Sequence, residues 1–196
     1  MRALLIALQF LTILPVRLQG EFTAQDIGRS LLFYPVVGLL IGIVLSLLGW
    51  NLTSQSPMVS AILVLAVWVT ITGALHIDGL ADSADAWLGG IGDKAKTLSI
   101  MKDPAAGPIA VVTIVLVLLI KFVMLTVLLA EQNWWALIWS VILARTALLF
   151  ALLFGLLVFL LLRYLMERRL NGFTGDTAGA MVELLETALL IFFVLF

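Results

Sequence analysis

Residues 107–130 read GPIAVVTIVLVLLIKFVMLTVLLA, and Lys121 is the only charged residue among them. About 20 apolar residues in a helix are enough to cross the hydrocarbon core of a bilayer, so this stretch predicts a transmembrane helix. For Lys121 we favour a structural ion pair or a side chain that reaches the membrane interface, because an isolated charge in hydrocarbon is costly.

The composition of the whole chain indicates the same class of protein. Hydrophobic residues make up 63% and charged residues 12% of the 196 residues, against about 45–50% and about 25% in soluble domains. The formal net charge is −1, and the absence of a basic run argues against nucleic acid as a partner. The chain has no cysteine, which excludes disulfides, thiolate zinc sites and iron–sulfur clusters.

Further apolar segments predict an all-α fold, a polytopic helical bundle of about six or seven membrane helices. We expect one transmembrane domain over residues 1–196, with polar loops near 76–106 and 163–176 forming the site. The other predicted membrane segments are 3–16, which is short enough to be an interfacial helix instead, 31–50, 58–75, 134–162 and about 177–196.

The run at 134–162 is longer than one crossing requires. It fits one long tilted helix. Alternatively, Arg145 marks a cytoplasmic helix end, and a segment near residues 146–156 is missing from the chain.

The polar loop at 76–106 contains HIDGLADSAD at residues 76–85. In a helix, Asp78, Asp82 and Asp85 would fall within about 60° of one another and repel. A bound divalent cation would turn that repulsion into binding, and carboxylate oxygens favour Mg²⁺ or Mn²⁺. Because Mg²⁺ often shares its shell with substrate phosphates, a phosphate- or diphosphate-bearing substrate is expected. A solvated acidic loop, with Asp78 or Asp82 as a helix N-cap, is the weaker alternative.

Three residues near this cluster are further candidates for the site. His76, the only histidine, fits a general base, a phosphate contact or a metal ligand, and equally an interfacial histidine. Lys102 could neutralise a phosphate, and Asp103 could join the metal shell. Local sequence slightly favours Asp103 as a helix start, with Pro104 at the first helical position.

A second group of polar residues lies near the end of the chain, in TGDTAG at residues 174–179. Asp176 alone would be an ordinary N-cap. Glu183 and Glu186 lie inside an otherwise apolar helix, where acidic groups are costly. Their predicted partners are Lys121, Arg145 or a metal ion.

Loop charges predict the orientation. The loops at 51–57 and 131–133 carry no Lys or Arg, whereas the two polar loops carry Lys94, Lys96, Lys102, Arg163, Arg168 and Arg169. The positive-inside rule places both basic loops, and the acidic cluster with them, in the cytoplasm.

Six blocks follow one another along the chain: ALQFLTILPV at 7–16, GRS at 28–30, FYPVVG at 33–38, HIDGLADSAD at 76–85, IMKD at 100–103 and TGDTAG at 174–179, followed by Glu183. Taken in this order, they resemble the cobalamin synthase family. The resemblance covers nearly the whole chain, and its most specific blocks are the acidic cluster and the later TGDTAG.

The resemblance implies a Mg²⁺-dependent transferase, with Mn²⁺ as a substitute, in the cytoplasmic (inner) membrane of a prokaryote, with its site facing the cytoplasm. Its substrates would be adenosylcobinamide-GDP and α-ribazole or its 5′-phosphate. Its products would be GMP and adenosylcobalamin or its phosphate. A homo-oligomer is compatible with the sequence.

The resemblance also implies roles for individual residues. Asp78, Asp82 and Asp85 would hold the metal on the pyrophosphate, with Asp103 and Glu183 as further candidate ligands. His76 would position or deprotonate the attacking ribose hydroxyl, and the expected catalytic residues are His76 and Asp82. The expected substrate-binding residues are Arg29, Lys102, Thr174 and Asp176.

Two departures from the family stand out. Ala86 occupies a position that is commonly Gly in the family. The family's loop and further span between the regions matching Arg145 and Leu156 also have no counterpart here.

Two other functions fit parts of the pattern. One is a different Mg²⁺-dependent membrane enzyme, a phosphotransferase or a prenyltransferase. The other is a transporter, with Lys121, Arg145 and Glu183 lining a path. A transporter should carry its acidic residues near mid-membrane, whereas most of them cluster at one surface here, which favours an enzyme.

Overall fold

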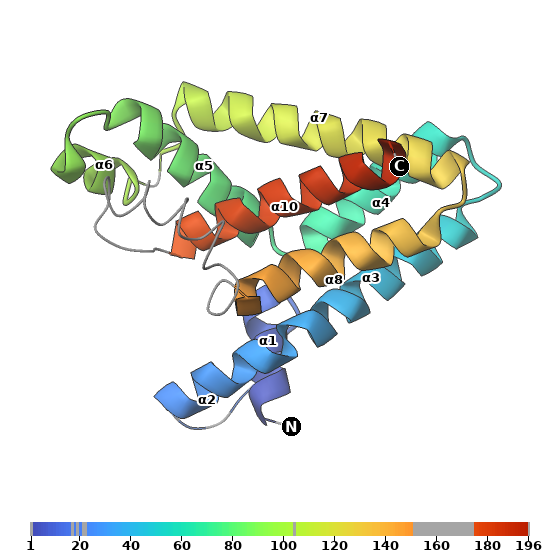
Figure 1. Cartoon of the computed structure of the whole chain (residues 1–196), viewed down its shortest axis with the longest axis horizontal. Coiled ribbons are helices and arrows are strands. Elements are labelled where there is room, and N and C mark those ends of the chain that lie inside the picture. Colours follow the sequence, from blue (N-terminus) through green and yellow to red (C-terminus); the bar gives the residue numbers. More distant parts are fainter. Residues whose placement is uncertain are drawn as a thin grey trace.

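A computed structural model describes residues 2–16, 18, 20, 23–103, 105–150 and 175–195. Every regular element in the described part of the chain is helical, which confirms the all-α prediction (Figure 1). The elements are α1 (Arg2–Leu11), α2 (Ala24–Ser30), the short 3-10 helix η1 (Leu31–Phe33), α3 (Tyr34–Asn51), α4 (Pro57–Ile71), α5 (Leu75–Gly89), α6 (Lys94–Ile100), α7 (Pro108–Ala130), α8 (Trp134–Phe150) and α10 (Gly175–Leu195).

Among the residues that the structure describes, two helical stretches are long and apolar enough to cross a membrane. They are Gln25–Asn51, which joins α2, η1 and α3, and Pro108–Ala130, which is α7. A third is obtained if α4 and α5, which meet at 85°, count as one broken span. The expected six or seven spans are therefore not confirmed by the described residues. At 10 residues, α1 is about 15 Å long and too short to cross, which fits an interfacial helix.

The sharp bend between α4 and α5 arises from two consecutive left-handed residues, Gly73 with φ 63° and Ala74 with φ 55°. The turn is braced from outside, because the backbone amide of Ile13 donates to the carbonyl of Ile71 at 2.9 Å. A side chain at Gly73 would also collide with Ile13, whose Cγ2 lies 2.5 Å from the Cβ position. The bend turns the acidic α5 out of line with the apolar α4, and we treat α5 as lying outside the membrane-crossing segments.

The main core is built along α3 and α8, which pack against each other along their length (Figure 1). A Cβ atom at Gly42 would lie 2.8 Å from Ile138 Cα, and one at Gly38 would lie 3.0 Å from the Val141 carbonyl oxygen. Small residues of this kind let two backbones approach closely, as in other membrane helix pairs.

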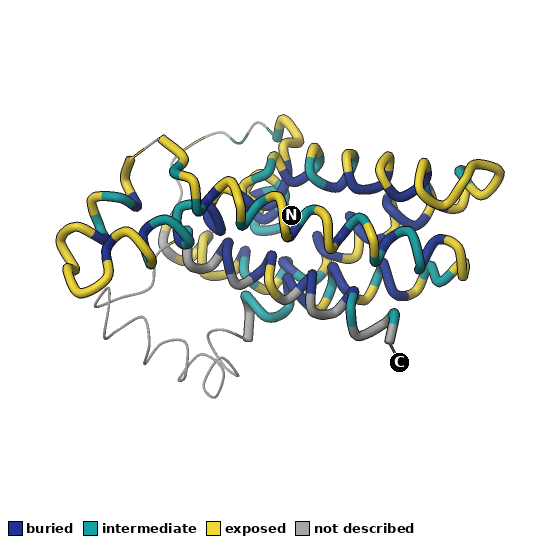
Figure 2. Tube along the Cα trace, turned by 90° about the horizontal axis from the view of Figure 1, so that it is seen from above, coloured by how far each residue is buried: buried dark blue, intermediate teal, exposed yellow. Residues whose placement is uncertain are grey.

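Buried residues face inward and exposed residues follow the outer sides of the helices (Figure 2). On α7 the outward side is apolar, as a lipid-facing surface should be. Its exposed members include Val111, Val112, Val115, Leu116, Leu119 and Val123.

The two ends of the bundle differ in charge. The loops at 51–57 and 131–133, which lack Lys and Arg, lie at one end, and α6 with Lys94 and Lys96 lies at the other (Figure 1). The segregation is the one that the loop charges predict.

The helix α8 runs without a break through Arg145, whose side chain is fully buried. Arg145 is therefore not the last residue of this helix, which the structure describes as far as Phe150. Residues 151–174 lie outside the described part of the chain, so the predicted missing segment near 146–156 stays a prediction.

Candidate active site

The helix α5 carries three aspartates at one end of the bundle. Asp78 is exposed, and Asp82 and Asp85 are half-buried. Partial burial, followed by the negative charges of Asp78, Asp176 and Asp85, raises the pKa of the Asp82 carboxyl. Asp82 is therefore repelled by three other carboxylates, two from α5 and one from α10.

Asp176 reaches this group because α10 crosses α5 at a pair of glycines. A Cβ atom at Gly79 would lie 2.7 Å from the carbonyl oxygen of Asp176, and one at Gly179 would lie 3.5 Å from Gly79 Cα. The two backbones therefore touch with no side chain between them. The structure brings Asp176, predicted only as a substrate-binding residue, into the electrostatic environment of Asp82.

Asp85 has a structural task that the sequence pattern did not predict. Its Oδ1 accepts a hydrogen bond from the Ala110 amide at 2.9 Å, and its Oδ2 accepts one from the Gly107 amide. Gly107 is the N-cap of α7 and Pro108 its first residue, so a carboxylate from another helix satisfies two free donors of the first turn. The Gly-Pro pair was the available signal, because Pro at a first helical position marks a helix start.

A metal role for these carboxylates stays a prediction. In the described part of the chain, no three His, Asp or Glu side chains are arranged to hold a metal ion. Mg²⁺ usually takes only one or two carboxylates and completes its shell with water and substrate phosphate. Because both oxygens of Asp85 bind α7, a cation would be left with Asp82 and either Asp78 or Asp176, an all-oxygen set that suits Mg²⁺.

His76 lies directly under the α5–α10 crossing, at the start of α5. The residue is 4% exposed, and its Nε2 has no hydrogen-bond partner among the described residues. A Cβ atom at Gly179 would lie 3.3 Å from His76 Cα. Glycine at 179 therefore keeps α10 close over the histidine. Burial, followed by the positive charges of Arg145 and Lys121, lowers the pKa of His76 to about 3.

Three other predicted site residues, Arg29, Lys102 and Asp103, make no described contact with the aspartates of α5. Arg29 is exposed on α2, which lies far from α5 and α6 in Figure 1. Lys102 and Asp103 are exposed after α6, and Asp103 Oδ1 accepts from the Ala105 amide at 3.0 Å. The prediction that Asp103 starts a helix is wrong, because α7 begins at Pro108 and is capped by Asp85. Thr174 lies outside the described residues.

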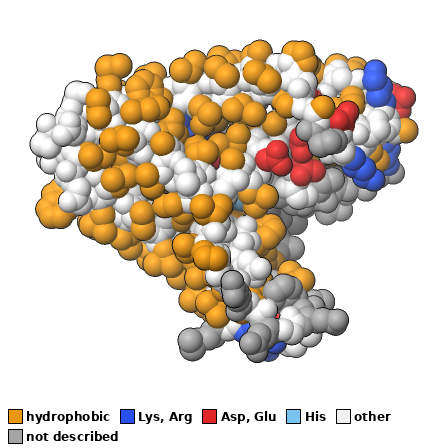
Figure 3. Space-filling model, turned by 180° about the vertical axis from the view of Figure 1, so that it is seen from behind, with side chains coloured by type: hydrophobic (Ala, Val, Ile, Leu, Met, Phe, Trp, Pro, Cys, Tyr) orange, Lys and Arg blue, Asp and Glu red, His pale blue; other side chains and the backbone are white. Residues whose placement is uncertain are grey.

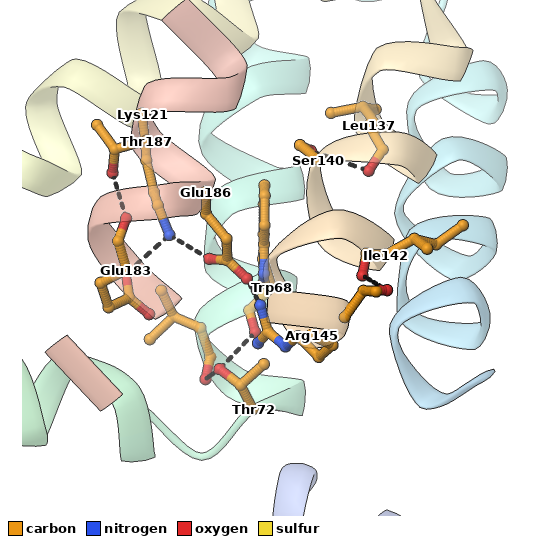
Figure 4. A network of polar contacts seen from close by, with 12 residues as sticks. Trp68, Thr72, Lys121, Leu137, Ser140, Ile142, Arg145, Glu183, Glu186 and Thr187 are labelled. Carbon is orange, nitrogen blue, oxygen red and sulfur yellow. Dashed lines mark hydrogen bonds and ion pairs between the residues drawn. The ribbon is translucent and has the colours of Figure 1, made fainter. Parts of the chain in front are cut away.

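Glu183 lies in a buried ion pair and not beside the aspartates of α5. Lys121 Nζ donates to Oε2 of Glu183 at 2.8 Å and to Oε2 of Glu186 at 2.7 Å (Figure 4). Arg145 forms an ion pair with the other oxygen of Glu186. The predicted pairing of these acids with Lys121 and Arg145 is confirmed, and the ion pair favoured for Lys121 is present.

The polar and apolar surfaces of the protein are separated. Figure 3 shows apolar side chains over most of one face, with acidic and basic side chains gathered at the end that carries α5 and α6. A carboxylate cluster at the end of an apolar bundle fits chemistry performed at the membrane surface rather than transport through its centre.

The cap formed by Asp85 gives a first testable prediction. We expect Asp85→Ala to lower the free energy of unfolding by about 1 kcal/mol, because it removes the acceptor of two amides in the first turn of α7. Relief of repulsion within the cluster offsets only about 0.2–0.5 kcal/mol per pair. Thermal unfolding of the purified protein measures the difference.

Asp78→Ala is the matched control for that prediction. It removes one charge from the same helix, and no hydrogen bond of the Asp78 side chain is described. It should leave the midpoint of thermal unfolding unchanged or slightly higher. Equal midpoints for Asp85→Ala and the unchanged protein would show that the cap contributes nothing.

The fold and the site define a helical membrane protein with an acidic centre at one end, a class to which membrane-bound transferases belong. The chain matches the family described as cobalamin-5-phosphate synthase over residues 3–155 and 146–194. It belongs to this family, as the sequence blocks predicted, and is therefore an enzyme of cobalamin biosynthesis, a transferase.

Three curated relatives of the chain carry the name adenosylcobinamide-GDP ribazoletransferase. The protein from Pseudomonas fluorescens (strain Pf0-1) is 47% identical over 243 residues, covering 100% of both chains. The one from Stutzerimonas stutzeri (strain A1501) is 46% identical over 237 residues, covering 97% of both. The one from Pseudomonas entomophila (strain L48) is 48% identical over 233 residues, covering 95% of this chain and 96% of the relative. No solved structure matches the chain.

These alignments are longer than the chain itself. The alignment with the Pseudomonas fluorescens (strain Pf0-1) relative spans 243 residues, whereas the chain has 196. Part of that alignment therefore has no counterpart in this chain. Both matched ranges of the family include residues 146–155, the region where the sequence analysis expects a missing segment.

Proposed function

We propose that the enzyme transfers the adenosylcobinamide phosphate group from adenosylcobinamide-GDP to α-ribazole or its 5′-phosphate. A ribose hydroxyl oxygen forms a bond to the phosphorus that carries the cobinamide. The bond between that phosphorus and the bridging oxygen breaks, and GMP leaves with that oxygen. The products are GMP and adenosylcobalamin or its 5′-phosphate.

The observation that supports this proposal best is the meeting of α5 and α10 around Asp82. A diphosphate is repelled by four carboxylates unless a cation lies between them, so such a cluster suits a substrate that brings Mg²⁺ with it. When bound, Mg²⁺ would neutralise charge on the diphosphate and orient it. Asp82 with Asp78 or Asp176 would hold the ion, and Asp85 would keep the first turn of α7 in place beside them.

We propose that His76 forms a hydrogen bond with the hydroxyl group that attacks the phosphorus. Its Nε2 is buried and unpartnered among the described residues. Because the lowered pKa keeps the ring neutral, this nitrogen can accept a hydrogen bond from the hydroxyl and orient it. We further propose that the site faces the cytoplasm across the inner membrane of a prokaryote, as the basic residues on α6 and in the loop after it favour.

The test is an assay in nanodiscs with adenosylcobinamide-GDP, α-ribazole 5′-phosphate and Mg²⁺. GMP and the cobamide should appear in equal amounts, and only when both substrates are present. EDTA should stop the reaction, and added Mg²⁺ or Mn²⁺ should restore it. GMP release without cobamide would indicate a hydrolase, and turnover in EDTA would exclude the metal-dependent mechanism.

A further inference from the structure

Two cations and two carboxylates are buried together where α7, α8 and α10 meet. Lys121 comes from α7, Arg145 from α8, and both Glu183 and Glu186 from α10 (Figure 4). The four side chains are between 0% and 4% exposed. None of them is used by the proposed reaction, and the charges within the group balance.

In this arrangement, the cations of α7 and α8 both form ion pairs with carboxylates of α10. Glu186 contacts both cations, and Glu183, one turn earlier, contacts Lys121 as well. A fourth helix, α4, also contacts this group, because the centroid of the Trp68 ring lies 4.7 Å from Lys121 Nζ. Removing one partner of a buried ion pair leaves an uncompensated charge, which is strongly unfavourable. A slide of α10 by one turn, about 5.4 Å, would take at least one of the two carboxylates away from its cation.

The other end of α10 carries the residues that such a slide would displace. Asp176 precedes Glu183 by seven residues, about 10 Å along the helix axis, and Gly179 rests on His76. Two glycines at the crossing allow a close approach but offer no side chains that interlock. We infer that the ion pairs of Lys121, Arg145, Glu183 and Glu186 set the depth of α10 and so hold Asp176 beside Asp82; these four are positioning residues.

A distance measurement tests this directly, without any substrate. The chain has no cysteine, so spin labels can be placed selectively. Cysteines would replace Leu88 on α5 and Leu184 on α10, which are 56% and 55% exposed. Double electron–electron resonance in nanodiscs should give one narrow distance distribution. Lys121→Met should shift or broaden it.

The charge-balanced double variant separates charge from packing. Lys121→Met with Glu183→Gln leaves the Arg145–Glu186 pair intact, and it should return the distribution towards the original. Turnover should follow the distances. Lys121→Met should lower kcat by more than about tenfold, since a misplacement of about 1 Å can reduce a rate by about 10²-fold, and the double variant should recover most of it.

Leu125→Ala is the matched control on α7, because it creates a cavity one turn from Lys121 without changing any charge. It should lower thermal stability and leave the label distance unchanged. Should Lys121→Met fail to insert, Glu186→Gln tests the same point, because it leaves Arg145 without its partner. An unchanged distance in either charge variant, or an equal change in Leu125→Ala, would overturn the inference. Because the distance needs no substrate, failure of the proposed reaction would not affect this result.

Discussion

Asp82→Asn is expected to lower kcat/KM by at least about 10²-fold and, in metal-free protein, to raise the midpoint of thermal unfolding. The loss of activity follows from the place of Asp82 among four carboxylates, where a substrate diphosphate and its cation would bind. The gain in stability follows from the removal of like-charge repulsion, about 0.2–0.5 kcal/mol for each neighbour one turn away. The nanodisc assay and thermal unfolding in EDTA measure the two effects.

Because the pKa of Asp82 is raised, the stability difference between Asp82→Asn and the unchanged protein should depend on pH in a defined direction. A carboxyl whose pKa is higher in the folded state costs stability when it is ionised. That cost is present at neutral pH and is relieved as pH falls through the raised folded-state pKa. The stability advantage of Asp82→Asn over the unchanged protein should therefore shrink on acidification.

Asp93→Asn is the matched control. Asp93 lies at the same end of the bundle and caps α6 through the Lys96 amide at 3.1 Å. Asparagine caps a helix about as well as aspartate, so both activity and stability should stay near their original values. Full activity in Asp82→Asn, or a lower midpoint in metal-free protein, would contradict the assigned role.

Gly79→Val is the second substitution with a large expected effect, on fold and activity together. Its Cβ would lie 2.7 Å from the Asp176 carbonyl oxygen and 2.9 Å from Asp176 Cα, so backbone atoms would have to move apart. Overpacking of this kind costs about 1–3 kcal/mol, or several degrees in thermal midpoint. Because α5 and α10 separate, we also expect activity to fall by about 10²-fold or more.

Gly28→Val provides the comparison for that substitution. Gly28 is also helical, and a Cβ atom there meets nothing within 4 Å. It should leave turnover nearly unchanged, with only the small propensity difference between Gly and Val in a helix. If Gly79→Val retained full turnover, the close crossing would have no part in the reaction.

The sequence predicts the elements well because most of them are apolar stretches bounded by polar turns. The predicted spans at 31–50, 58–75 and 107–130 correspond to α3, α4 and α7 within a few residues. The count of spans was less predictable, since hydropathy does not reveal the left-handed turn at Gly73 and Ala74. That turn ends α4 and redirects the chain.

At the site, the sequence predicted which residues matter better than what each one contacts. The spacing of Asp78, Asp82 and Asp85 predicted a shared helix face, and α5 is indeed helical there. Spacing within one helix carries no information about a second helix. The cap that Asp85 gives to α7 and the approach of Asp176 to Asp82 therefore required the tertiary structure.

The short joint between α4 and α5 has a mechanical consequence. With 15 residues, α4 is about 22 Å long, less than the thickness of a typical hydrocarbon layer, so bilayer and helix must adapt to each other by thinning or tilt. Because the turn at Gly73 and Ala74 joins α4 to α5, a tilt of α4 would also change the orientation of α5. A change in lipid thickness that tilted α4 would therefore also move the carboxylates of α5.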